Sequence, residues 1–250
     1  MRLREYSEAI PKPMVNIGYR PILWHLMKYY AHFGHKDFIL CLGHKGDIIK
    51  NYFRHYDECL SNNFTMSKGG QEIQIANTDI DDWTITFVET GLNSNVGQRL
   101  KAVEPFLKGE EMFLANYTDG LTDCCLPNII DNFTRQDAIA SFLSVRPIQS
   151  FHVAKIEEDG KVLDIKDLNK SGLWINGGFM VLRSEIFSYI KQGEELVYEP
   201  FQRLIKEGKL ISYRYEGFWI SMDTFKDKQR LDDMYAKGET PWAVWSNLPG

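Results

Sequence analysis

The feature of this sequence that most constrains its fold is the alternation of helical and short apolar segments. The stretch from Tyr19 to Gly34 (YRPILWHLMKYYAHFG) has apolar residues at helical spacing, a proline in its first turn and a glycine at its end. The apolar run DFILCL (37–42) follows, and a second helix is predicted from about residue 47 to 56. Apolar strands that alternate with helices are typical of parallel sheets buried on both faces. The pattern therefore predicts an α/β fold, with a mixed, mostly parallel sheet flanked by helices.

The second half of the chain follows a different pattern. A buried strand is predicted at 138–145, and the stretch FHVAKIEEDGKVLDIKDL predicts a hairpin that turns at Asp159-Gly160. A strand with a glycine pair (WINGGFMVLR) and a helix near 224–236 come later. We find no linker or repeat, so the sequence predicts one domain with a smaller C-terminal α+β lobe.

Composition excludes several functional classes. The formal net charge of −5 argues against a nucleic-acid binder held by phosphate contacts. No apolar run approaches the roughly 18 residues of a membrane span. The four cysteines show neither a disulfide framework nor zinc-ligand spacing, so we expect reduced thiols in a cytoplasmic protein.

Two aspartates lie at the ends of predicted apolar strands. Asp119 lies in FLANYTDGLTD, and Asp223 lies in GFWISMDTF just before a predicted helix. A carboxylate at the end of a strand is well placed to hold Mg²⁺, which prefers one or two carboxylates with waters and phosphates. The alternatives are that Asp119 only makes a turn with Gly120 and that Asp223 only caps the helix.

Three further stretches contain residues that could bind a ligand or take part in catalysis. Lys12 lies between two prolines that stiffen the backbone, so its ammonium is rigidly presented, although a solvated loop lysine is the default alternative. The segment NSNVGQRLK begins a helix whose free N–H groups could meet an anion, or whose first turn is merely capped and solvated. Two glycines in WINGGF indicate a bulge, the close approach of a ligand or tight packing.

Taken together, these stretches resemble the sugar nucleotidyltransferases, and most closely the glucose-1-phosphate cytidylyltransferases. The resemblance runs over essentially the whole chain. It rests on PKPMVNIGYRPILWHLMKYY, VGQRLK, YTDGLTD, WINGGF, GFWISMDT and DKQRL, which occur in the family's order and approximate spacing. The implied fold is the Rossmann-like nucleotide-diphospho-sugar transferase type, with a nucleotide-binding part in residues 1–150 and a sugar-binding and C-terminal part in residues 151–250.

The resemblance also implies a role for individual residues. Asp119 and Asp223 match the family's two Mg²⁺ ligands, Lys12 matches the lysine that neutralises the reacting phosphate, and Arg2 matches the arginine that closes the signature loop. The remaining matches are expected to bind substrate: Ser94, Gly97 and Arg99 on the nucleotide side, Thr118 before the metal ligand, and Asn176 and Gly177 on the sugar side.

The reaction implied by the resemblance joins CTP and a sugar 1-phosphate, with glucose 1-phosphate as the default, and releases pyrophosphate. The sugar phosphate is already an anionic nucleophile, so neither a general base nor a covalent intermediate is required. Catalysis is then mostly positioning and charge stabilisation. A homo-oligomer is a further possibility.

The N-terminus departs from the family pattern. In the family a strand and a glycine-rich loop ending in Gly-Thr-Arg-Leu come first, whereas here Met1 stands in place of the threonine. We therefore expect the chain to begin inside the loop whose N–H groups would cradle the triphosphate. Either a longer protein is the working enzyme, which the filled downstream positions favour, or the truncation is natural. We expect the 250-residue chain to turn over poorly and an upstream strand and glycine loop to rescue it.

The substrate-side motifs also depart from the pattern, and they leave rival functions open. The stretch IKDLNKSGLWINGG lacks the family's Glu-Lys-Pro, and Gly97-Gln98 replaces two glycines before the arginine. The alternatives are a nucleotidyltransferase for another triphosphate or sugar 1-phosphate, a catalytically impaired sugar-nucleotide-binding homologue, and an α/β scaffold without the site.

Overall fold

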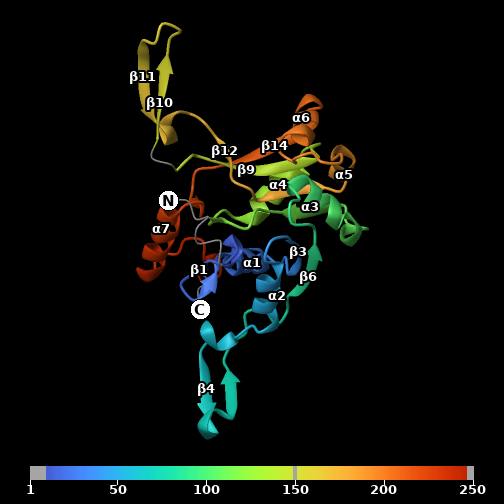
Figure 1. Ribbon diagram of the computed structural model, residues 1–250, viewed down its shortest axis with the longest axis vertical. Coiled ribbons are helices and arrows are strands. Elements are labelled where there is room, and N and C mark those ends of the chain that lie inside the picture. Colours follow the sequence, from blue (N-terminus) through green and yellow to red (C-terminus); the bar gives the residue numbers. More distant parts are fainter. Residues whose placement is uncertain (1–9, 149–150, 247–250) are drawn as a thin grey trace.

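A mixed five-stranded sheet forms the centre of the molecule (Figure 1). The computed structural model describes residues 10–148 and 151–246. Central strand β9 (Ala140–Val145) pairs in parallel with β14 (Leu210–Tyr215). It pairs in antiparallel fashion with β12 (Ile175–Asn176) and β13 (Met180–Arg183), and β13 also pairs with β7 (Met112–Ala115). Strands β7, β9 and β14 therefore run in one direction, and both halves of the chain contribute to the predicted mixed sheet.

Helices cover both faces of this sheet, as the α/β prediction requires. Leu143 and Val181 face a core shared with α1 (Ile22–His32) and α4 (Leu126–Thr134). Their neighbours Ala140 and Leu182 belong to a second core, because successive strand residues point to opposite faces. The helices of this second core are α3 (Val96–Val103), α5 (Ile186–Tyr189) and α6 (Glu199–Lys206).

The predicted N-terminal helix and strand are present, but the strand is less buried than predicted. Helix α1 begins after Pro21, and Gly34 lies just beyond its end with a φ of 92°. Strand β3 (Asp37–Leu42) pairs in parallel with β6 (Thr84–Glu89), and helix α2 (Gly46–Arg54) packs beside them. Within β3 only Leu42 is buried. The prediction that this strand is fully buried is wrong. Among the described residues β3 pairs along one edge only, which leaves most of the strand partly exposed.

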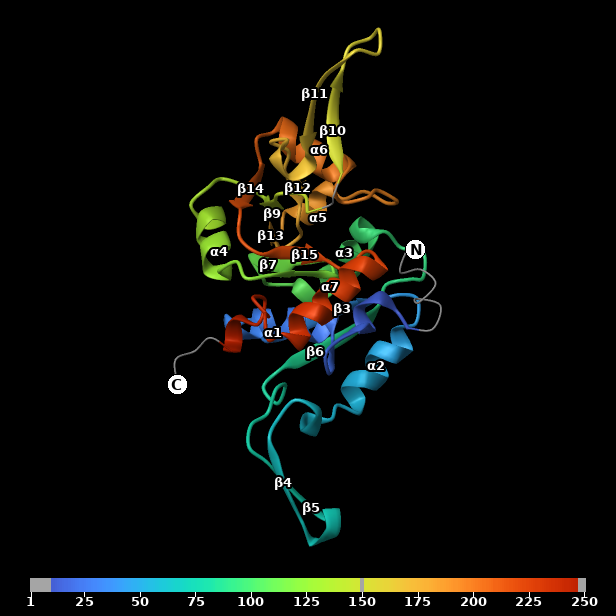
Figure 2. The ribbon, with the colours of Figure 1, turned by 90° about the vertical axis from the view of Figure 1, so that its left-hand side faces the viewer.

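Two hairpins project from opposite ends of the body (Figures 1 and 2). One is formed by β4 (Phe64–Ser67) and β5 (Glu72–Ile75), the other by β10 (His152–Ile156) and β11 (Val162–Asp167). The predicted turn at Asp159-Gly160 joins β10 to β11, with Gly160 at a φ of 87°. No helix in the described part of the chain is long and apolar enough to cross a membrane.

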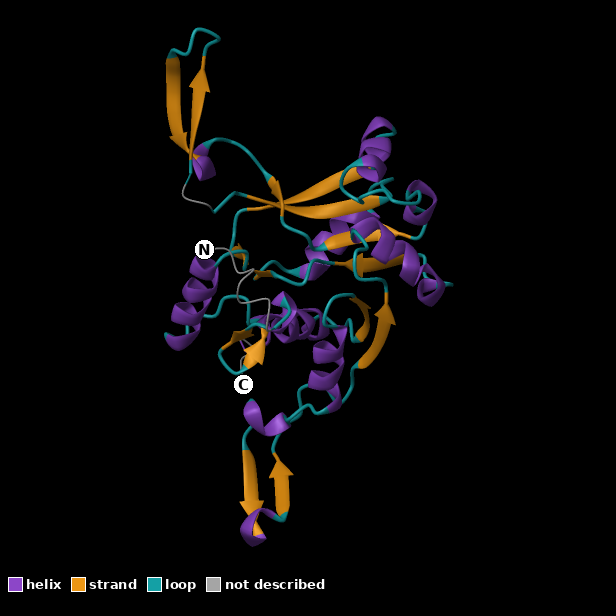
Figure 3. Ribbon diagram, in the orientation of Figure 1, coloured by secondary structure: helices purple, strands orange, loops and turns teal. Residues whose placement is uncertain are grey.

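Two short strand pairs complete the fold. They are β1 (Asn16–Ile17) with β2 (Arg20–Pro21), and β8 (Gly120–Thr122) with β15 (Trp219–Ser221). Helix α7 (Phe225–Ala236) follows β15, and Figure 3 shows it at the side of the body, apart from both hairpins. The tail returns to α1, where Trp242 is buried against His25.

Candidate active site

The β8–β15 pair brings Asp119 and Asp223 to the same end of a two-stranded ladder. Asp119 directly precedes β8, and Asp223 comes two residues after the end of β15. The antiparallel register places Gly120 opposite Ser221, and the backbone N–H of Met222 donates to the carbonyl of Asp119 at 2.9 Å. Two acidic side chains that are 104 positions apart in the sequence are therefore held side by side by backbone hydrogen bonds.

Lys12 lies between the two carboxylates. Its Nζ donates to Oδ2 of Asp119 at 2.5 Å and to Oδ1 of Asp223 at 2.7 Å. The backbone of Lys12 belongs to a single 3₁₀ turn, Lys12–Met14, which Pro11 precedes and Pro13 occupies. Prolines restrict φ, so this turn presents the lysine stem from a fixed base. The structure thus brings together three of the predicted residues.

Ser221 is a polar partner that the sequence did not indicate. Its hydroxyl donates to Oδ2 of Asp223 at 2.7 Å, which leaves Oδ1 to face Lys12. Burial on its own would raise the pKa of Asp223, but the hydrogen bonds from Lys12 and Ser221 outweigh it and hold this pKa below its usual value. Burial would likewise lower the pKa of Lys12, yet the charge of Asp119 and both hydrogen bonds raise it.

The alternative that Asp223 is a helix cap is not what the structure shows. The N-cap of α7 is Thr224, whose hydroxyl accepts from the backbone N–H of Asp227 at 3.2 Å. The Asp227 carboxylate accepts in return from the N–H of Thr224, which completes a capping box. Asp223 therefore keeps its side chain for Lys12 and Ser221. Asp119 does lie in a turn, together with Thr118, so its turn role and its contact with Lys12 coexist.

This pair of carboxylates suits a magnesium ion. Within residues 10–148 and 151–246 no group of three or more His, Cys, Asp or Glu side chains could hold a metal. Mg²⁺ is usually held by only one or two carboxylates, with waters and substrate phosphates as its other ligands. Asp119 and Asp223 each place one oxygen within hydrogen-bond distance of a single point, the Lys12 nitrogen. The donor set fits the ion, and Mg²⁺ binding stays a prediction.

A small pocket lies next to the two carboxylates. Its volume is about 270 Å³, and it is lined by Asn116, Tyr117, Asp119, Gly120, Ile175, Asn176, Gly177, Trp219, Ser221 and Asp223. The structure thus brings Asn176 and Gly177, predicted from the WINGG motif, to the same cavity as the two aspartates. Sequence reasoning missed Tyr117 and Trp219 as pocket residues. Their positions within the YTDG and GFWISMD stretches were the available signal.

Close packing explains the glycine pair that separates β12 from β13. A Cβ on Gly177 would lie 3.0 Å from Nε1 of Trp219, and one on Gly178 would lie 2.3 Å from Oδ1 of Asn116. Gly178 also has a φ of 79°, a conformation that favours glycine. Asn116 Oδ1 accepts from the N–H of Phe179 at 3.0 Å. The two glycines therefore let the pocket wall pack tightly.

The side chains predicted for the nucleotide side form hydrogen bonds elsewhere in the fold. Ser94 donates to the carbonyl of Thr90, and Arg99 donates to Oγ1 of Thr90 at 2.7 Å and to the carbonyl of Leu42 at 3.2 Å. These bonds tie the start of α3 to the ends of β3 and β6. The structure does not place either side chain among those that line the pocket.

Three other predicted residues have different surroundings. Gly97 packs against a neighbouring loop, since a Cβ there would lie 2.4 Å from the carbonyl oxygen of Glu194. Thr118 precedes Asp119 without lining the pocket. Arg2, predicted to be catalytic, lies outside the described residues.

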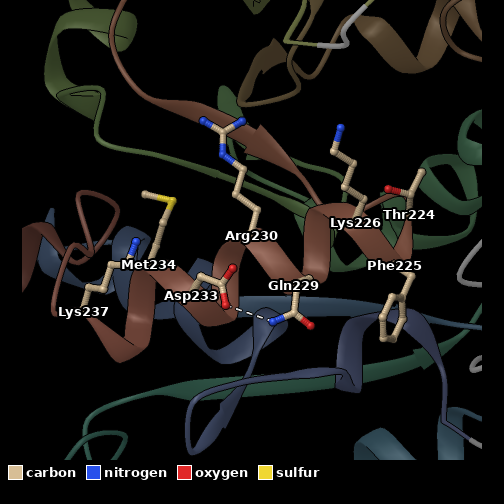
Figure 4. Close-up of a pocket in the computed structure, with 8 residues that line it drawn as sticks. All are labelled: Thr224, Phe225, Lys226, Gln229, Arg230, Asp233, Met234 and Lys237. Carbon is tan, nitrogen blue, oxygen red and sulfur yellow. Dashed lines mark hydrogen bonds between the residues drawn. The ribbon is translucent and has the colours of Figure 1, made fainter.

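A larger hollow, of about 850 Å³, lies along one helix and contains none of the predicted site residues. Figure 4 shows its side chains, all from α7 or the residues that flank it: Thr224, Phe225, Lys226, Gln229, Arg230, Asp233, Met234 and Lys237. Gln229 donates to Asp233 at 2.9 Å within this set. All of its lining side chains come from one helix and the residues that flank it, so the hollow is bounded on one side only. This surface is therefore a weaker candidate than the pocket at Asp119 and Asp223.

Known proteins match the chain over nearly its whole length. It is 37% identical over 246 residues to the glucose-1-phosphate cytidylyltransferase of Salmonella typhi, a match that covers 98% of this chain and 95% of that protein. The glucose-1-phosphate cytidylyltransferase of Salmonella typhimurium strain LT2 matches with the same identity and coverage. No protein-family model matches the chain.

A solved structure has the same fold. The crystal structure of HddC from Yersinia pseudotuberculosis superposes with a TM-score of 0.65, 19% sequence identity and coverage of 94% of each chain. This likeness confirms the predicted nucleotide-sugar transferase fold, and the sequence matches confirm the predicted family. The chain is therefore a nucleotidyltransferase enzyme of the glucose-1-phosphate cytidylyltransferase family.

Proposed function

We propose that this protein transfers a cytidylyl group from CTP to a sugar 1-phosphate, with glucose 1-phosphate as the first candidate. The products are a CDP-sugar and pyrophosphate. The observation that carries the proposal is the convergence of Lys12, Asp119 and Asp223 at the edge of the pocket that Asn176 lines. The names and 37% identity of the relatives support cytidine and glucose as the first substrates to test.

The pocket supports a division between sugar and phosphate. Besides the aspartates, its lining includes Asn176, Tyr117 and Trp219, whose amide, phenol and indole ring are groups suited to sugar hydroxyls and ring faces. At about 270 Å³ it lies just below the roughly 300–1,000 Å³ of drug-sized ligand pockets, which suits a single sugar ring. The phosphate would then lie toward Lys12.

In this reaction Lys12, Asp119 and Asp223 would act by stabilising charge. A phosphate oxygen of the sugar 1-phosphate forms a bond to the α-phosphorus of CTP, and the bond from that phosphorus to the pyrophosphate oxygen breaks. Negative charge builds on the transferring phosphate and on the leaving group, and Lys12 supplies a positive charge there. Asp119 and Asp223 would hold Mg²⁺, which when bound neutralises phosphate charge as a Lewis acid. The pocket wall fixes the angle of attack by holding the sugar.

An assay of pyrophosphate release tests the proposal. Purified protein receives Mg²⁺ with each pairing of CTP, UTP, dTTP, ATP or GTP with glucose 1-phosphate or mannose 1-phosphate. We expect the fastest release with CTP and glucose 1-phosphate, and a loss of at least about 100-fold in the Asp223→Asn variant. Fastest release with another pairing would keep nucleotidyl transfer and change the substrate. If no pairing releases pyrophosphate, the proposed activity fails, and a sugar-nucleotide-binding homologue becomes the better interpretation.

A further inference from the structure

The Lys12 ammonium lies in the space that a cation shared by Asp119 and Asp223 needs. It contacts Oδ2 of Asp119 at 2.5 Å and Oδ1 of Asp223 at 2.7 Å. The other oxygen of Asp223 accepts from Ser221, so Oδ1 is the oxygen that faces inward. Mg²⁺ binds carboxylate oxygens at about 2.0–2.1 Å, which is closer than an ammonium approaches them. The same pair of oxygens cannot hold both partners, on grounds of space and of repulsion between like charges.

From this overlap we propose that Lys12 and a divalent cation compete for Asp119 and Asp223, and that an anion near Lys12 admits the cation by drawing the ammonium away. The inference rests on the proposed function for the identity of that anion, the phosphate of a substrate. This inference gives Lys12 a second role beside charge stabilisation. Its ammonium occupies the cation position until a phosphate binds.

The surroundings of Lys12 allow such a movement. The backbone of this residue is held in the Lys12–Met14 turn, but the head group sits on a flexible four-carbon stem. Its side chain is 29% exposed, and that of Asp223 is 56% exposed, so the ion pair lies at the rim of the site. An ammonium at the rim can turn toward an incoming anion without breaking the fold.

The competition makes cation and phosphate binding mutually dependent. Two carboxylates and one ammonium together carry one net negative charge. The ammonium therefore weakens the electrostatic attraction between the two carboxylates and an incoming cation. When an anion holds the ammonium elsewhere, both carboxylates face the cation. By thermodynamic linkage, if the anion raises the affinity for the cation by some factor, the cation raises the affinity for the anion by the same factor.

The first test measures Mn²⁺ binding to the whole protein without nucleotide or sugar. Electron paramagnetic resonance of free Mn²⁺ or calorimetry gives the affinity of wild type and of Lys12→Met. We expect the variant to bind Mn²⁺ about tenfold more tightly or better, because the competing positive charge is gone. Adding Asp223→Asn to Lys12→Met should remove this gain and so locate the ion. Equal affinity in wild type and Lys12→Met overturns the proposal.

One control variant and one substitute variant keep this result interpretable. Lys36 pairs with Asp82 on the surface, so Lys36→Met removes one positive charge elsewhere and should leave Mn²⁺ affinity unchanged. An equal gain in Lys36→Met would show an effect of net charge and would overturn the competition. Circular dichroism checks the fold, and Lys12→Gln, which also removes the charge, replaces Lys12→Met if that variant does not fold.

The second test examines the anion. Sulfate serves as a phosphate-like probe that chelates Mn²⁺ weakly, with chloride at matched ionic strength as the reference. We expect sulfate to tighten Mn²⁺ binding severalfold in wild type and to have no such effect in Lys12→Met. No difference between sulfate and chloride in wild type overturns the coupling to an anion. Both tests measure binding alone, so they can succeed where nucleotidyl transfer fails, and the reverse also holds.

Discussion

The indole N–H of Trp219 donates a 2.9 Å hydrogen bond to the carbonyl oxygen of Gly177. The bond joins β15, which leads to Asp223, to the chain that follows Asn176. Two walls of the pocket, one acidic and one glycine-rich, are therefore fixed to each other through a buried ring. The spacing between the proposed cation site and the proposed sugar site depends on how closely Trp219 approaches the glycine pair.

This packing predicts that the glycine pair is intolerant of side chains. Gly178→Ala combines a positive φ with a Cβ only 2.3 Å from Asn116, so we expect a loss of about 2–4 kcal/mol in the free energy of unfolding. Gly34→Ala is the matched control, because Gly34 has a φ of 92° and a Cβ added there would have no atom within 4 Å. It should cost about 1 kcal/mol. Urea unfolding measures both, and equal losses would show that crowding by Asn116 is unimportant.

Much of the fold could be predicted from local pattern. The proline before α1, the glycine after it and the apolar run of β3 each act within a few residues, and all three are found as predicted. The exposure of β3 was not predictable in this way. Apolar composition says that a strand can be buried, whereas its actual burial depends on partners that come from distant parts of the chain.

The candidate site shows the same division between local and distant information. Strand-end aspartates and the proline-flanked lysine were identifiable individually, but their meeting depends on the register of β8 with β15. Ser221 could not be identified, since a serine in a strand has no distinctive pattern. Arg99 and Gly97 were assigned by resemblance, and their contacts with Thr90 and Glu194 arise from packing that no motif encodes.

The capping box predicts opposite effects for two adjacent residues. Thr224→Ala removes the cap of α7 and should lower stability by about 1 kcal/mol, with turnover largely kept. Asp223→Asn should change stability little and reduce pyrophosphate release by about 100-fold or more, since it weakens the proposed cation site. Thermal unfolding and the release assay on both variants separate the two roles. A large stability loss in Asp223→Asn would instead make this residue structural.

Buried His25 predicts a specific weakening of the fold in mild acid. Burial lowers the pKa of this imidazole to about 4, and a ring nitrogen bonds the carbonyl of Ile17 at 3.0 Å. The unfolded chain takes up the proton near pH 6.5, well before the folded chain does. Unfolding therefore binds protons between these values, and stability falls as the pH drops from about 6.5 to 4, by about 3 kcal/mol in total.

Urea unfolding at several pH values checks this behaviour. His25→Gln should be less stable near neutral pH but should lose much of the slope between about pH 6.5 and 4.5. An unchanged slope in His25→Gln would show that other groups bind the protons.

The root of the β4–β5 hairpin depends on a buried ionic network around Asp79. Its carboxylate accepts from Lys28 at 3.1 Å and from Tyr56 at 3.0 Å, and the Arg20 guanidinium lies 3.6 Å away. The side chains of Arg20 and Asp79 are only 3% and 9% exposed. Removing one member of a buried pair leaves an uncompensated charge, which commonly costs about 3–5 kcal/mol.

We therefore expect Asp79→Ala to destabilise the protein by about 3 kcal/mol and to speed hydrogen exchange in residues 57–79. Asp82→Ala breaks the exposed pair with Lys36 and should cost no more than about 1 kcal/mol. Asp79 is not among the residues that line the pocket, so the Asp79→Ala protein that remains folded should keep its Mn²⁺ affinity. Unchanged exchange in Asp79→Ala would mean that the hairpin is held by its own strands rather than by this network.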